Sequence, residues 1–259
     1  MNFDWTFFWH YLLRPSSVYL NGLWLTLCIS VISQGLGTLL GLFGALARIS
    51  RYRLLQVPAR VFIWGMRGTP LLVQIVFIYT GLAAANIFRF EDIDLGLVTL
   101  PGNIQAGILA LTLNEAAYMA EIIRAGIGSV DVGQTEASKS LGMTYLLYMR
   151  RIILPQAARV VVPPLGNEFN GMLKNTTLLS VIGVPELLLA TQMVTSATFR
   201  VFELYLVVAC YFLTLTTLWG LVQQRLERRF GEPAAAVSQH QGTSAFGRLF
   251  RFGRTGDAK

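Results

Sequence analysis

Long apolar segments separated by short polar connections dominate the hydrophobic pattern of this chain. A helix that crosses a bilayer needs about 20 mostly apolar residues, at a rise of about 1.5 Å per residue. Five stretches satisfy this requirement, so the pattern predicts an all-α membrane protein with five spans. The expected spans are residues 23–47, 61–85, 104–123, 157–179 and 202–222, within a transmembrane domain of residues 18–229.

The two ends of the chain differ from this domain. Residues 1–17 are rich in aromatic side chains, which suit a segment at a membrane interface on the extracytoplasmic side. Residues 230–259 are rich in Gly, Ala, Ser and Gln and have no apolar period, so we expect a disordered cytoplasmic tail. Phe and Arg interleave near its end, so contact with membrane lipid is an alternative to a solvated tail.

Composition supports the membrane assignment. Of the 259 residues, 54% are hydrophobic and only 14% are charged, whereas a soluble domain carries about 25% charged residues. The net charge of +7 would favour nucleic-acid binding in a soluble protein. Here the positive charges cluster at the ends of the apolar segments and in the tail, as in membrane proteins, where such charges set the orientation of the spans. No nucleic-acid partner is expected.

The charges of the connections also predict the direction of the spans. The first connection carries four arginines and no acid, whereas the second carries Glu91, Asp92 and Asp94 against Arg89. Short basic connections stay in the cytoplasm. We therefore expect the N-terminus outside and the C-terminus inside.

Polar residues inside the spans are candidates for a substrate pathway, because such groups are costly in a membrane and face the bundle interior. Gly68 and Pro70 weaken the second span beside Arg67, and the sequence PPLG at 163–166 predicts a broken fourth span. A broken helix with polar groups at mid-membrane indicates a transporter's substrate site. The predicted pathway residues are Arg67, Gly68, Thr69, Asn114, Glu115, Asn167, Glu168 and Asn170.

Each of these features has a structural alternative. Arg67 is equally compatible with a charged side chain beside a kink, and the fourth-span residues with an internal network between helices. Glu121 and Arg124 lie three residues apart, which favours an ion pair on one helical face. Small residues recur every four positions in the first span, where packing inside the bundle is at least as favoured as a dimer contact. They are Ser33, Gly37, Gly41 and Ala45.

Motifs for nucleotide and metal binding are absent from the sequence. The chain has three lysines, none of which follows a glycine, so it has no GxxxxGK[ST] loop for phosphate. HExxH, GxSxG and CxxC motifs are missing as well. We therefore expect no cofactor and no metal on this chain, and any ATP would be used by a separate subunit.

The connection at residues 133–155 carries a further motif. Glu136-Ala137-Ser138 is followed by Gly142 and then by Ile152, Leu154 and Pro155. This spacing resembles the EAA loop of the permease subunits of ATP-binding-cassette (ABC) importers, with Ser138 in place of the third-position Ala. The segments RGTPLLVQ, LNEAAYMAEIIRAGIGSV and LKNTTLLSVIGVPELL resemble the branch of histidine, glutamate, glutamine, arginine and opine permeases, over about residues 17–229.

The resemblance implies a five-span type I ABC importer permease bundle with a cytoplasmic coupling helix that docks on an ATPase. In that role Gly142 would allow a tight turn or a close approach, and Pro155 would end the element before the fourth span. The expected docking residues are Glu136, Ala137, Ser138, Lys139, Gly142, Met143, Tyr145 and Leu146.

The resemblance also implies the partners and the location. The implied partners are an ATPase dimer, a second permease that is identical or homologous, an extracytoplasmic amino-acid-binding protein and an amino acid substrate. The implied location is the bacterial inner membrane. A carboxylate at Glu168 favours a cationic amino acid, because opposite charges attract more strongly in a low dielectric, although Lys174 would be near enough to neutralise it. An ATPase-independent secondary transporter would explain the polar spans but not the EAA spacing, and a membrane scaffold would need neither.

Overall fold

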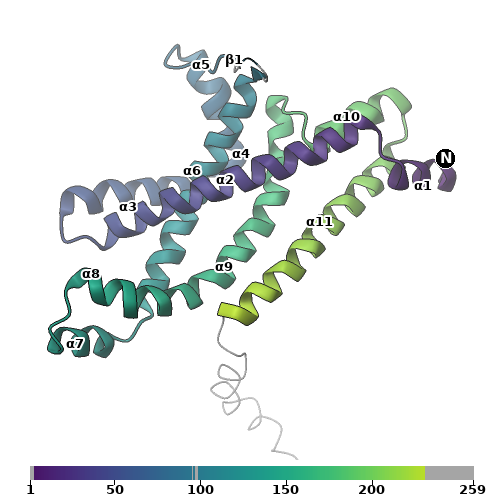
Figure 1. Ribbon diagram of the computed structural model, residues 1–259. Helices are drawn as coiled ribbons and strands as arrows, with labels where there is room; N and C mark the ends of the chain where they lie inside the picture. Colours follow the sequence, from purple (N-terminus) through teal and green to yellow (C-terminus); the bar gives the residue numbers. More distant parts are fainter. Residues whose placement is uncertain (1–2, 95, 97–98, 231–259) are drawn as a thin grey trace, which may run out of the picture.

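The computed structural model describes residues 3–94, 96 and 99–230, and almost all of this part is helical (Figure 1). The expected tail after residue 230 lies outside the described residues. The helices are α1 (Trp5–Leu13), α2 (Ser17–Ile49), α3 (Arg53–Gly68), α4 (Leu71–Val76), α5 (Leu82–Ala84), α6 (Gly102–Gly128), α7 (Val132–Ser140), α8 (Tyr145–Tyr148), α9 (Leu154–Asn175), α10 (Leu187–Thr198) and α11 (Val201–Phe230).

Shorter elements complete the chain. π-helical turns at Phe77–Gly81 and Met149–Ile153 join α4 to α5 and α8 to α9, and a 3-10 turn at Thr176–Ile182 extends α9. The strands β1 (Ile93–Asp94) and β2 (Thr99–Leu100) pair antiparallel, with Ile93 opposite Leu100. This small hairpin and the pair α7–α8 lie at opposite ends of the bundle (Figure 1).

Three helices of the described residues are each long and apolar enough to cross a membrane, namely α2, α6 and α11. Two bent pairs satisfy the same requirement jointly: Arg53–Gly68 with Leu71–Ala84, bent by 109°, and Tyr145–Ile182 with Leu187–Thr198, bent by 51°. The described part of the chain therefore has three candidate spans, or five if each bent pair is one span.

The break expected in the second span is present. α3 ends at Gly68, and Pro70 precedes α4 in an extended conformation. Proline fixes its own φ and disfavours helix at the residue before it, so the chain turns here.

The break expected at residues 163–166 is wrong. Pro163 and Pro164 lie inside α9, which is continuous from Leu154 to Asn175. Each proline removes one backbone hydrogen bond, a loss that membrane helices tolerate where other helices pack on them. α11 packs against this turn, where the Trp219 indole N–H donates to the carbonyl of Gly166 at 2.8 Å.

The bend of this segment lies instead after Ile182. Gly183 has φ +78°, a left-handed conformation that glycine adopts without steric cost. The Glu186 carboxylate then accepts hydrogen bonds from the amides of Leu188 and Leu189, both at 2.8 Å, and so caps α10.

The most extensive helix–helix contact in the described chain joins α2 and α6. The small residues that recur along α2 are buried against α6, so their packing role within one bundle is confirmed. A Cβ atom added at Gly41 would lie 2.5 Å from Cβ of Met119 and 3.0 Å from the carbonyl oxygen of Ala116. Glycine is therefore needed for this approach.

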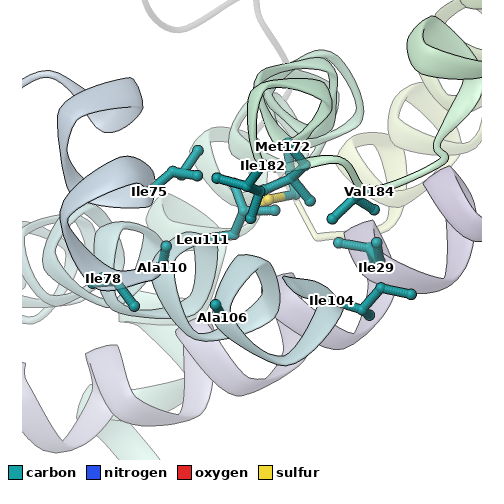
Figure 2. Packing of buried hydrophobic residues seen from close by; sticks show 11 residues of the cluster. Ile29, Ile75, Ile78, Ile104, Ala106, Ala110, Leu111, Met172, Ile182 and Val184 are labelled. Carbon is teal, nitrogen blue, oxygen red and sulfur yellow. The ribbon is translucent and has the colours of Figure 1, made fainter. Parts of the chain in front are cut away.

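A hydrophobic cluster beside this contact joins α2, α4, α6 and α9 (Figure 2). Ile29 comes from α2, Ile75 from α4, Ala110 from α6, and Met172 from α9. Val184, which follows the bend at Gly183, is fully buried in the same cluster. The cluster fixes the two bent segments against the α2–α6 pair.

We expect Gly41→Ala to lower the free energy of unfolding by about 1–3 kcal/mol, because the added methyl overpacks the contact with α6. Gly35→Ala on the same helix is the matched control, since its Cβ would meet nothing within 4 Å and alanine favours helix by about 0.5–1 kcal/mol. Thermal unfolding of the two purified variants in one detergent checks the difference. Equal stability of both variants would contradict the packing role of Gly41.

Candidate functional site

The coupling segment, residues 132–148, consists of α7, α8 and the turn between them. It projects from the end of the bundle away from the β hairpin (Figure 1). Leu141 and Leu146 are 80% and 75% exposed, and Val132 and Tyr145 are also largely exposed. Exposed apolar side chains gathered on one projection are typical of a protein interaction site.

Local hydrogen bonds hold this segment in shape. The Asp131 carboxylate caps α7 by accepting from the amide of Gly133 at 2.6 Å. Gly142 has φ +73°, and its amide donates to the carbonyl of Lys139 at 2.9 Å, which turns the chain sharply after α7. Ser138 is 1% exposed and donates to the carbonyl of Gln134, so its side chain supports α7 from inside.

The other expected docking residues differ in exposure. Met143 is half-buried, and the rest are exposed on the coupling segment. The exposed ones are Glu136, Ala137, Lys139, Gly142, Tyr145 and Leu146.

The expected end of this element at Pro155 is wrong. The helix that begins at Tyr145 continues through the π-helical turn at Met149–Ile153 into α9. Pro155 lies directly after this π-helical turn, at the second residue of α9, and the helix continues through it. One continuous helical path therefore joins the coupling segment to the bundle.

The first group of expected pathway residues meets at the bend between α3 and α4. Gln74, which is buried, donates to the carbonyl of Met66 at 2.8 Å and to the hydroxyl of Thr69 at 2.8 Å. The Asn114 amide of α6 donates to the Gln74 side-chain oxygen at 3.0 Å. Thr69 and Asn114 are thus joined through Gln74, which the sequence signalled only as an amide at the end of RGTPLLVQ.

Glu115 is tied to α2 rather than exposed to a cavity. It is 4% exposed, and its carboxylate accepts a hydrogen bond from the amide of Gln34 at 2.6 Å. A buried carboxylate needs such a donor, because an unsatisfied charge in a low dielectric is costly. Gln34 was not among the predicted residues, although a single amide in an apolar run is a signal for a buried polar contact.

The α9 residues point in different directions. The Asn167 side-chain oxygen accepts from Gln223 of α11 at 3.1 Å, so this residue contacts the outer helix. Glu168 is half-buried. The side-chain oxygen of Asn170 is buried without a hydrogen-bond partner among the described residues.

Arg67, at the end of α3, lies over the ring of Tyr118, with its guanidinium carbon 5.1 Å from the ring centre.

The expected ion pair between Glu121 and Arg124 is confirmed, with a guanidinium nitrogen 2.5 Å from the carboxylate. Arg48 of α2 binds the other oxygen of the same carboxylate, a contact that the sequence did not indicate. Glu121 therefore joins α2 to the final turns of α6.

Comparison with known proteins decides the family. The family described as binding-protein-dependent transport system inner membrane component matches residues 37–232. The chain belongs to this family. Its all-helical membrane fold follows, as does its assignment as a multi-pass permease subunit of the inner membrane.

Individual relatives agree with this assignment. The arginine transport system permease protein ArgU of Corynebacterium glutamicum is 40% identical over 79% of this chain and 66% of its own length. The glutamine transport system permease protein GlnP of Escherichia coli is 35% identical over 88% of this chain and 98% of its own. A crystal structure of an amino acid ABC transporter with histidines matches with a TM-score of 0.77 and 38% identity, over 88% of this chain and all of its own.

The resemblance to polar amino acid permeases of ABC importers is thereby confirmed. In such a transport system the ATPase is a separate subunit, and it uses the ATP, so the permease carries no cofactor for the reaction. The partners implied are that ATPase and a binding protein. The alternatives of a secondary transporter or a scaffold are not supported.

Proposed function

We propose that this permease carries a polar amino acid into the cytoplasm, paired with a second permease that is identical or homologous. The observation that carries the proposal is the coupling segment, an exposed apolar projection joined to α9 by an unbroken helix. An ATPase dimer would dock there, and an extracytoplasmic amino-acid-binding protein would deliver the substrate at the other end. Relatives named for arginine and glutamine, and a related transporter solved with histidines, support a polar amino acid.

Two results favour docking at the coupling segment over a structural role for it. Its large apolar side chains are exposed, and its turn at Gly142 has no side chain within 4 Å of the position of a Cβ atom. Apolar contact with a groove on the ATPase would cover these side chains, with Glu136 and Lys139 at the charged rim.

We expect Gly142→Asp to abolish most of the stimulation of the ATPase by the permease, since an unpaired charge buried in a contact costs about 3–5 kcal/mol. ATPase activity and uptake by the purified complex in proteoliposomes are the measurements. Gly142→Asn is the control, because asparagine has the same shape and tolerates positive φ but carries no charge. Normal stimulation in the Asp variant would rule out docking at this turn.

The proposed orientation places α1 outside and the end of α11 inside. The basic connection between α2 and α3, and the acidic connection that contains β1, support it through the positive-inside rule. Asp92 and Tyr52 are both exposed, so a cysteine at either position would be accessible from its own side of the membrane.

We expect Asp92→Cys to react with an impermeant thiol reagent added outside intact cells, and Tyr52→Cys to react only after the membrane is opened. The native Cys28 and Cys210, which are half-buried and unpaired, are first replaced by serine. The reverse labelling of the two positions would overturn the proposed orientation.

Glu168 is the strongest candidate for selecting a cationic substrate. It is half-buried and forms no ion pair within the described residues, so Lys174, which is exposed, does not neutralise it there. Glu115, in contrast, already has a partner in Gln34. A partly buried carboxylate attracts a cationic side chain more strongly than water-exposed groups do, and it repels an acidic one.

We expect Glu168→Gln to reduce uptake of a cationic amino acid such as arginine about tenfold, which corresponds to about 1.4 kcal/mol, and to leave a neutral amino acid less affected. Uptake of a panel of amino acids by the reconstituted importer is the measurement, with Glu91→Gln in the exposed connection as the control. Unchanged uptake across the panel, in a complex that assembles normally, would exclude Glu168 from selection.

A further inference from the structure

Two adjoining hollows lie where α2, α3 and the end of α6 meet, and together they form what we name the arginine cleft. Arg48, Arg60 and Arg124 line one hollow, with a volume of about 380 Å³. Arg48, Arg60 and Arg67 line the other, with a volume of about 540 Å³. Each has room for a phosphate group and its substituents.

The charges of the arginine cleft do not balance. Glu121 is the one acid among its lining residues, against four arginines, which leaves an excess of three positive charges. Glu121 is already bound by Arg48 and Arg124. Arg60 and Arg67 form no ion pair within the described residues; Arg60 donates only to Gln56 at 3.2 Å, and Arg67 lies over Tyr118. Two guanidinium groups thus remain available for an anion, and guanidinium pairs well with phosphate oxygens.

α3 carries basic and apolar side chains next to one another on its exposed surface. Its 16 residues extend for about 24 Å, which is less than the hydrocarbon thickness of about 30 Å, and it meets α4 at 109°. Arginines recur every seven residues along it, and an apolar stripe runs beside them. The arginines are Arg53, Arg60 and Arg67, and the exposed stripe is Leu54, Val57, Val61 and Trp64.

We propose that the arginine cleft binds the phosphate of an anionic phospholipid, whose acyl chains lie along the apolar stripe of α3. Inorganic phosphate offers the same charge to Arg60 and Arg67, but it would leave the stripe uncovered. Trp64, which lines the cleft and is 77% exposed, joins the two halves of the site and contacts both the headgroup region and the chains. The lipid would brace α3 against α2 and α6.

The test uses the purified importer complex in phosphatidylcholine nanodiscs that contain brominated phosphatidylglycerol or, in a parallel sample, brominated phosphatidylcholine. Bromine quenches tryptophan fluorescence on contact, and the signal of Trp64 is the difference between the unmodified complex and Trp64→Phe. We expect phosphatidylglycerol to quench Trp64 severalfold more than phosphatidylcholine does. Equal quenching by the two lipids would overturn the proposal.

A paired substitution locates the selectivity. Arg60→Gln with Arg67→Gln should lower the preference for phosphatidylglycerol about tenfold, since basic groups near an anionic surface each add to its attraction. Arg225→Gln with Arg228→Gln is the matched control, which removes two exposed arginines of α11 and should keep the preference. Loss of the preference in both paired variants would mean that general surface charge attracts the lipid, and it would contradict binding in the arginine cleft. Displacement of the brominated phosphatidylglycerol by added inorganic phosphate would show a free-anion site and would overturn the lipid assignment.

Discussion

The close approach of α2 to α6 is the constraint on which the other contacts depend. It exists because the facing positions of α2 carry almost no side chain: a Cβ atom at Gly37 would lie 2.6 Å from Glu115, and one at Gly41 would lie 2.5 Å from Met119. In a membrane, helices gain little from the hydrophobic effect against lipid, so such close packing and interhelical hydrogen bonds supply the attraction. Both are found here, because the same approach brings Gln34 within 2.6 Å of Glu115.

Features that depend on local chemistry were predictable from the sequence. The four-residue spacing of small residues on α2 indicated a packing face, and the three-residue spacing of Glu121 and Arg124 indicated their ion pair. Gly68 and Pro70 gave the break between α3 and α4, since both residues act on their own backbone. In each case the determining groups lie within a few residues of one another, so no knowledge of the tertiary structure was required.

Features that depend on distant partners were not predictable in this way. PPLG at 163–166 looked like a break, but α11 packs on that turn and α9 continues through it. The true bend at Gly183 had a local signal, a glycine followed by Pro185 and the capping Glu186, yet a glycine alone does not say which φ it adopts. Asn167 shares a helix with Glu168 but contacts α11 instead, because neighbouring positions on a helix face different partners. Gln34 and Gln74 acquire their roles only when α6 is placed beside them.

The continuity of the helix from Tyr145 to Ile182 changes how movement would pass through the bundle. A hinge at Pro155 would have let the coupling segment move while α9 stayed still. The observed path has no non-helical residue between α8 and Ile182, so a displacement applied at Tyr145 reaches α9 without passing through a loop. On the other side, residues 129–131 between α6 and α7 are not helical, and α6 is held by Gln34 and Arg48 of α2. Under the proposed docking, force from the ATPase would therefore reach α9, and Glu168 with it, through continuous helix, whereas it would reach α6 through a non-helical connection or through the packing of α9 against Gly126. Such unequal coupling favours relative motion of these elements, which alternating access requires.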